Sequence, residues 1–355
     1  DNIKVNGSSS NTYVAYLFAH NNNDGGFGEP GDQDIIKCGS YTGNGSSTGP
    51  SVNLGFEPQF VMIKSASGTE GWYVYDNMRG MIVGGDDAEL AWNLDTEENG
   101  ILGTSKAILD PTPTGFNITN TSSTANTSAH TYIYMAIRRG GMQTPTAASS
   151  VFAATDMSSS TLANTGFAVD MSLDSQRTSS SDNFLNDRLR GSGVYMSTNN
   201  RTAEATGGTR HFDSNQGVIY TSAFTGVNWA WKRARGYFDM VTWNVDGTGD
   251  QTINHNLGVS PEMVWSKNRD DGGSGSGDWW IGHTGLTGWD GDNENDRHAL
   301  KFTNAASAQQ GYHRDFTSTS IRLLGNAVGG YNTSHQGIAY LFATVAGVSK
   351  VGSYT

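Results

Sequence analysis

An acidic stretch of the chain has the residue types and the spacing of a cation-binding loop. Carboxylates at every second position could offer oxygen ligands to a hard cation such as calcium, and the candidate ligands are Asp290, Asp292, Glu294 and Asp296. The stretch departs from the EF-hand pattern because it has no glycine at its sixth position, and Lys301 stands where the bidentate glutamate would be. A bound calcium ion and a solvated acidic loop both stay open, and we expect no other cofactor.

Tryptophans close to this loop could bind a glycan, because the face of an indole ring can stack on a sugar. The candidates are Trp280 and Trp289. Their neighbour Trp279 falls at the same place in an internal repeat as Trp72, which favours a recurring core or inter-strand residue. We therefore predict a glycan contact only at Trp280 and Trp289, with a structural role as the alternative.

Constellations typical of catalysis are not found in the sequence. The 8 histidines are scattered and never paired at the helical spacing of a zinc site. No G-x-S-x-G nucleophile motif lies between a strand and a helix. The 34 acidic residues offer no pair that can be singled out for glycoside hydrolysis. We therefore expect that the protein is not an enzyme.

The composition favours strands and turns over helices. Only 16% of the residues are charged and 46 are glycine, while helix-forming residues are scarce. The formal net charge of −12 repels nucleic acid and anionic membranes. The single cysteine, Cys38, excludes an internal disulfide, and no apolar run approaches the roughly 20 residues of a membrane span. We expect neither a nucleic-acid partner nor membrane insertion.

One alternating aromatic strand recurs along the chain. Its clear copies are TYVAYLFA at 12–19, TYIYMAI at 131–137 and IAYLFA at 338–343, and VNWAWKR at 227–233 has the same period of two. A period of about a hundred residues between such copies indicates tandem domains.

Further landmarks keep the same order within these repeats. NLGFEPQFVMIK at 53–64 matches NLGVSPEMVWSK at 256–267, and DNMRG at 76–80 matches DRLRG at 187–191. KCGSYT at 37–42 nearly equals the last six residues, KVGSYT. We predict the end of a preceding repeat plus a linker at 1–35, repeats at 36–141, 142–235 (divergent) and 236–347, and the start of a further repeat at 348–355.

Short strands separated by Gly, Ser, Asn and Asp turns predict an all-β fold. We expect tandem antiparallel β-sandwich or jelly-roll-like domains of about 100 residues each. Basic residues stand where one repeat passes to the next, at Arg138 and Arg139 and again at 232–235. We expect them to form ion pairs that orient neighbouring domains.

The landmarks together resemble a known repeat domain. GSYTGNGS at 39–46, the two NLG segments and TYIYMAIRR at 131–139 are similar to a module of virion and tail-associated structural proteins of marine bacteriophages, where it often occurs in tandem beside laminin-G-like jelly-roll domains. The resemblance covers nearly the whole chain and is weakest in the second repeat. It implies a phage structural protein and brings no catalytic residues.

We therefore expect a virion structural protein, exposed on the virion surface or otherwise extracellular, in a tail fibre or similar appendage that contributes to host attachment. Its partners would be other copies of itself, other virion proteins and a host-surface glycan, bound through many weak contacts in an oligomer. A capsid decoration protein and a bacterial extracellular adhesin or surface filament subunit are the alternatives. A polysaccharide depolymerase is the last of the alternatives.

Overall fold

The computed structural model confirms an all-β protein in which every strand pair is antiparallel. It describes residues 12–20, 34–98, 107–140, 143–244, 250–270, 277–286, 298–302, 304–308, 313–323 and 335–354. The helical structure in these residues is a single 3₁₀ turn, η1 (Ala148–Ser150). No helix there is long or apolar enough to cross a membrane.

The first group of strands, unit 1, is a sandwich of two sheets. The larger sheet has the order β1-β8-β3-β4-β5 and the smaller one β2-β7-β6. First and eighth strands pair, as do second and seventh, which is the nested wrapping of a jelly roll. The strands are β1 (Ile36–Thr42), β2 (Ser51–Asn53), β3 (Pro58–Ser65), β4 (Trp72–Asp76), β5 (Leu90–Ala91), β6 (Leu109–Thr112), β7 (Gly115–Ile118) and β8 (Thr131–Arg138).

The last group, unit 3, has the same wrapping. Its larger sheet has the order β15-β23-β17-β18-β19-β20, and its smaller sheet is β16-β22-β21. One added strand, β20, lengthens the edge beyond the position of β5. The strands are β15 (Phe238–Asn244), β16 (Gln251–Asn254), β17 (Met263–Asn268), β18 (Trp280–His283), β19 (His298–Lys301), β20 (Asn304–Ala308), β21 (His313–Arg314), β22 (Ser320–Leu323) and β23 (Gln336–Phe342).

The middle group, unit 2, keeps this order but fuses strands that are separate elsewhere. The long strand β14 pairs with β9 along its length, with β13 near its start and with β10 near its end, so the six strands of unit 2 form one continuous sheet. A bulge at Ser159, whose φ is +53°, bends β9 to follow it. The strands are β9 (Phe152–Asn164), β10 (Met171–Gln176), β11 (Phe184–Asp187), β12 (Met196–Ser197), β13 (Arg210–His211) and β14 (Gly217–Trp231).

An Asn-x-Gly turn precedes β3, β10 and β17, which correspond to one another in the three units. Its glycines have φ of +78° at Gly55, +77° at Gly166 and +79° at Gly258, which other residues rarely adopt. In the first two units the asparagine side chain accepts a hydrogen bond from the glycine N–H. This shared geometry explains why the NLG segments stand out in the sequence. The exact boundaries drawn between repeats stay predictions.

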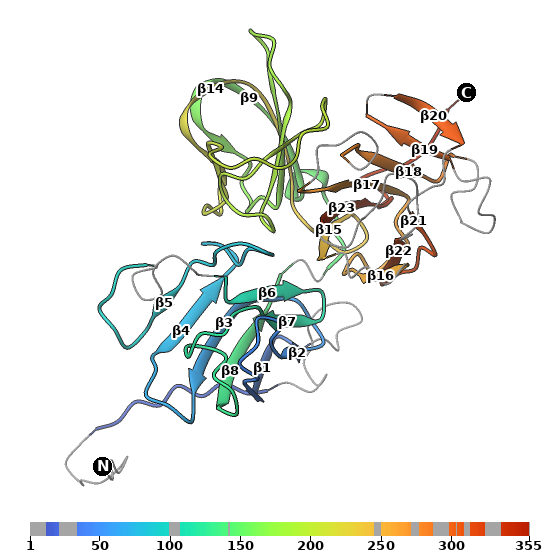
Figure 1. Ribbon diagram of the computed structural model, residues 1–355. Helices are drawn as coiled ribbons and strands as arrows, with labels where there is room; N and C mark the ends of the chain where they lie inside the picture. Colours follow the sequence, from blue (N-terminus) through green and yellow to red (C-terminus); the bar gives the residue numbers. More distant parts are fainter. Residues whose placement is uncertain are drawn as a thin grey trace.

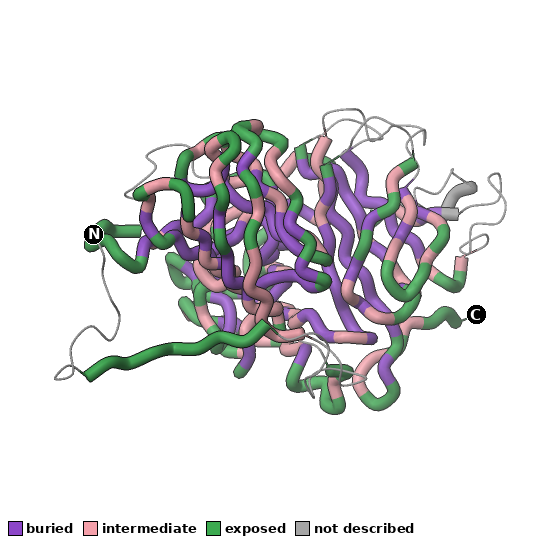
Figure 2. Tube along the Cα trace, turned by 90° about the horizontal axis from the view of Figure 1, so that it is seen from below, coloured by how far each residue is buried: buried purple, intermediate pink, exposed green. Residues whose placement is uncertain are grey.

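Each unit has its own apolar core, and one further apolar cluster joins two units. Figure 1 shows the three units as separate groups of strands, and Figure 2 shows that buried segments run through all of them. The joining cluster combines Met171 and Leu185 of unit 2 with Trp279, Ile338 and Tyr340 of unit 3. No such cluster of buried apolar residues in the described part of the chain combines unit 1 with another unit.

The aromatic segment at residues 12–19 is extended and lies outside these sheets. Figure 2 shows it as an exposed stretch, and Val14, Tyr16 and Leu17 are 80%, 83% and 91% exposed. Its counterparts β8 and β23 are central strands, each with a neighbour on both edges. The same sequence pattern is therefore buried in two places and uncovered in the third.

Candidate functional site

The tryptophan predicted to bind a glycan is part of a core. Trp280 is only 4% exposed and belongs to the apolar cluster of unit 3, and the ammonium of Lys301 lies 4.4 Å from the centre of its ring. A buried indole has no face on which a sugar could stack, so the glycan prediction is wrong for Trp280. Trp289 lies outside the described residues.

The candidate calcium ligands also lie outside the described residues. This applies to the whole set, Asp290, Asp292, Glu294 and Asp296. Among the residues that the structure does describe, no three His, Cys, Asp or Glu side chains come together in a way that could hold a metal ion. The calcium site stays a prediction.

Trp279 and Trp72 occupy the same register but different environments. Lys64 pairs with Trp72, and Ser266 pairs with Trp280, so Trp279 stands opposite the lysine that follows Ser266. Trp279 is 3% exposed and its indole N–H donates to the carbonyl of Ser197 in unit 2 at 2.7 Å, whereas Trp72 is 36% exposed. The position is not a core position of the repeat. It becomes buried where another unit covers it.

The matched DNMRG and DRLRG segments form the same turn, after β4 in unit 1 and after β11 in unit 2. In unit 1 the guanidinium of Arg79 donates to Asp76 at 2.6 Å, and in unit 2 that of Arg190 donates to Asp187 at 2.5 Å. The first pair is partly exposed, but the second is fully buried because Tyr340 of unit 3 covers it and donates its hydroxyl to Asp187 at 2.6 Å. A repeated turn has thus become part of a contact between units.

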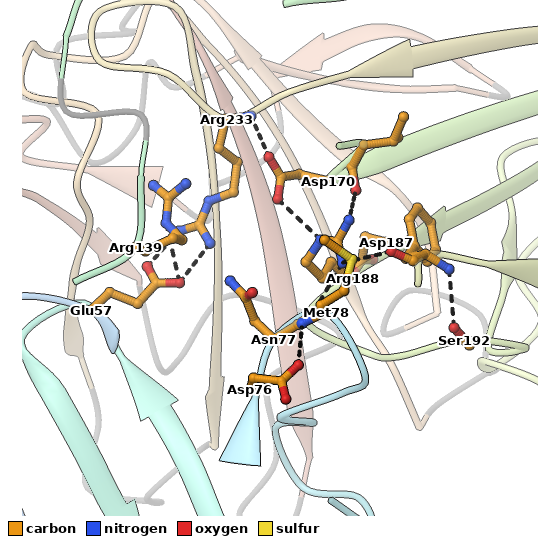
Figure 3. Close-up of polar contacts among 12 residues, drawn as sticks. Glu57, Asp76, Asn77, Met78, Arg139, Asp170, Asp187, Arg188, Ser192 and Arg233 are labelled. Carbon is orange, nitrogen blue, oxygen red and sulfur yellow. Dashed lines mark hydrogen bonds and ion pairs between the residues drawn. The ribbon is translucent and has the colours of Figure 1, made fainter. Parts of the chain in front are cut away.

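The basic residues at the repeat ends meet at the junction of all three units. Arg233, just after β14, donates two hydrogen bonds to Glu57 of unit 1, at 2.8 and 2.7 Å. Its Nε donates to Asp239 of unit 3 at 2.6 Å. Figure 3 shows Arg233 and Glu57 meeting, with Arg139 beside them. The prediction that these arginines form ion pairs between neighbouring domains is confirmed for Arg233.

Arg139 and Arg233 occupy equivalent positions. In unit 1, Ile137 of β8 pairs with Phe60 of β3, and in unit 2, Trp231 of β14 pairs with Met171 of β10. Each arginine lies two residues after the strand residue of its pair, Arg139 after Ile137 and Arg233 after Trp231. The Nε of Arg139 is 3.4 Å from Glu57, and its terminal nitrogen is 4.0 Å from Asp239. The two acids of the junction are therefore shared by two arginines.

Two more arginines connect unit 1 to its neighbours through backbone carbonyls. Arg188 of unit 2 donates to the carbonyl of Asn77 at 3.0 Å. Arg269 of unit 3 donates to the carbonyl of Val83 at 2.9 Å and forms a two-point pair with Glu204 of unit 2, at 2.8 and 2.9 Å. Unit 1 is thus held by charged and polar groups, whereas units 2 and 3 share an apolar cluster in addition to such polar contacts.

Arg233 and Asp239 hold each other in the ionised form at the junction. Burial on its own would raise the pKa of Asp239, but Arg233, Arg139 and His255 lower it below the ordinary value. Burial would also lower the pKa of Arg233, but Asp239 and Glu57 raise it above the ordinary value. Groups that stay ionised near neutral pH are suited to orienting domains and not to moving protons.

The sequence indicated the arginines of this junction but not the acids. Glu57 and Asp239 are far from them in the chain, and nothing in their local sequence distinguishes them from the other acids. One signal could have found Glu57: it lies inside the NLGFEPQF landmark, next to the turn that the repeats share.

Comparison with known proteins gives a family and no function. No curated protein matches the chain. A family model described as a domain of unknown function, DUF7483, matches residues 2–139 and 147–355. Since these ranges include nearly all of the sequence, the chain belongs to the DUF7483 family.

Proposed function

We propose that this chain is a structural part of a bacteriophage virion, in a tail fibre or similar appendage that contributes to host attachment. The observation that carries the proposal is the joining of three units of equal topology by buried contacts. Arg233 contacts all three units, and an apolar cluster joins two of them. An appendage needs such a rigid arrangement, because loops held at fixed spacing can bind a surface through many weak contacts.

The exposed strand at residues 12–19 supports a longer array. It has the sequence pattern of β8 and β23, which are sheet centres, and a strand with unpaired backbone groups and exposed aromatic side chains favours association. In this proposal it is the last strand of another unit of the same kind. Amide hydrogen exchange tests this directly: residues 12–19 should be protected in the assembled particle and unprotected in the isolated chain.

Electron microscopy of purified particles labelled with gold-conjugated antibodies against the chain tests the location. We expect label along a tail appendage. Label over the capsid would make the chain a decoration protein, and label on bacterial surfaces without particles would make it an adhesin. Release of reducing ends from host polysaccharide by the purified chain would make it a depolymerase. Each of these three results contradicts the proposal.

A further inference from the structure

A cleft of about 200 Å³ opens beside the three-unit junction, between unit 1 and unit 3. We call it the junction cleft. Its lining includes Arg138, Arg139 and Glu57 from unit 1, Arg235 from the linker before β15, and polar groups of unit 3. The unit 3 groups are His255, Asn256, Ser318 and Thr319. Two units therefore build one pocket, and neither could form it alone.

The charge of this lining is mainly positive, although the whole protein is acidic. Three arginines and one acid line the cleft, and the acid, Glu57, is already held by the two-point pair with Arg233. Asp239, behind the cleft, is likewise bonded to Arg233 at 2.6 Å. Burial lowers the pKa of His255, so the ring is neutral at neutral pH. Glu57 and Asp239 are thus both committed to a buried arginine.

Arg235 is positioned for binding without belonging to the ion network. In the described part of the chain it pairs with no carboxylate. Its stem lies across Gly258, where an added Cβ would be 3.0 Å from its Cγ and Nε. The glycine of the Asn-x-Gly turn therefore makes room for the arginine at the mouth of the cleft. Arg139 also has a buried Nε that makes no hydrogen bond with the described residues.

We propose that the junction cleft binds a small oxyanion, such as the carboxylate or sulfate group of a single acidic sugar. Guanidinium groups form short two-point hydrogen bonds with such anions. Ser318 and Thr319, which also line the cleft, carry hydroxyl donors that suit the remaining oxygens. A protein of net charge −12 attracts anions only where its structure gathers cations, so this binding is local. The inference does not depend on the assignment to a virion.

Calorimetric titration of the full chain at constant ionic strength tests the proposal, with glucuronate, sulfate and phosphate as probes and glucose as the neutral control. We expect the anions to bind and glucose not to bind. Stronger binding of glucuronate assigns the site to acidic sugars, and stronger binding of sulfate or phosphate assigns it to the free inorganic ion. Binding of no anion overturns the proposal.

Two variants show whether the binding takes place in the cleft. Arg235→Gln removes one guanidinium and should weaken binding about tenfold, the usual loss of one charged hydrogen-bonding partner. Arg235→Lys keeps the charge and should recover part of the affinity. Arg177→Gln is the matched control, because Arg177 is an exposed arginine of unit 2 that pairs with Asp156. Equal losses for Arg235→Gln and Arg177→Gln would also overturn the proposal.

Discussion

The junction of units 2 and 3 contains an apolar cluster besides its polar contacts, and in the described residues the junction of unit 1 with its neighbours has no such cluster. Units 2 and 3 share an apolar cluster that includes Met171, Ile338 and Tyr340. Unit 1 is attached by hydrogen bonds and ion pairs, with Arg233 and Glu57 at the centre. An apolar contact tolerates small shifts, but a buried ion pair is stable only when its geometry is kept. The polar junction should therefore fix the angle of unit 1 more strictly.

The largest effect is expected from Arg233→Met, which leaves Glu57 and Asp239 buried with less compensating charge. We expect the free energy of unfolding to fall by about 3–5 kcal/mol, the cost of removing one partner of a buried pair. Chemical denaturation monitored by tryptophan fluorescence measures it. The control is Arg177→Gln, whose ion pair is exposed and should contribute less than about 1 kcal/mol. If both variants lose the same stability, the polar junction is no stronger than a surface pair.

A buried histidine of unit 3 should make the stability of the protein sensitive to acid. Burial lowers the pKa of His313 from 6.5 to about 4, and its Nε2 lies 2.7 Å from the hydroxyl of Ser266. The unfolded chain binds a proton here between these two values and the folded chain does not, so stability falls as the pH drops from 6.5 to about 4. The loss should total roughly 3 kcal/mol.

At the junction, His255 should lose stability in the same direction, because burial lowers its pKa below 6.5, whereas Asp239 should not contribute. The pKa of Asp239 is below its ordinary value of 3.8, so its stabilising effect is present above 3.8 and is lost only at lower pH. Denaturation at several pH values between 6.5 and 4 should give a flatter profile for His313→Gln than for the unchanged protein. An unchanged slope for His313→Gln would assign the acid sensitivity to other groups.

The smallest effect concerns a single polar contact within the apolar junction. Trp279→Phe removes the N–H that donates to Ser197, and we expect a loss of about 1–2 kcal/mol from that bond and the carbonyl left without it. Trp72→Phe is the matched control at the same register, where the indole is 36% exposed, and it should be nearly neutral. Similar losses in both variants would mean that the repeat position, and not the contact between units, determines the cost.

The repeated elements could be predicted from the sequence because their signals are local. The alternating aromatic segments at 131–137 and 338–343 correspond to the strands β8 and β23. The Asn-x-Gly landmark corresponds to a turn with positive φ at Gly55 and Gly258. Each pattern is set by neighbouring residues, so it can be recognised without knowledge of the rest of the fold.

The contacts between units could not be predicted in the same way. Trp279 and Trp72 share a register, yet only the unit that covers Trp279 makes it buried. The prediction of a glycan contact at Trp280 is wrong because the sequence of two adjacent tryptophans does not show that both are buried. The pairing of Arg233 with Glu57 joins residues 176 positions apart, a separation at which one sequence carries no local signal.

The pairing of first and last strands determines how these units would respond to a pulling force. Ile36 lies opposite Ile137, Phe152 opposite Trp231 and Phe238 opposite Phe342, so the chain enters and leaves each unit at the same place. Tension applied through the polypeptide would open each strand pair one hydrogen bond after another, which needs less force than sliding all the bonds at once. The mechanical strength of the molecule therefore lies in the contacts between its units, because they hold the entry and exit points together.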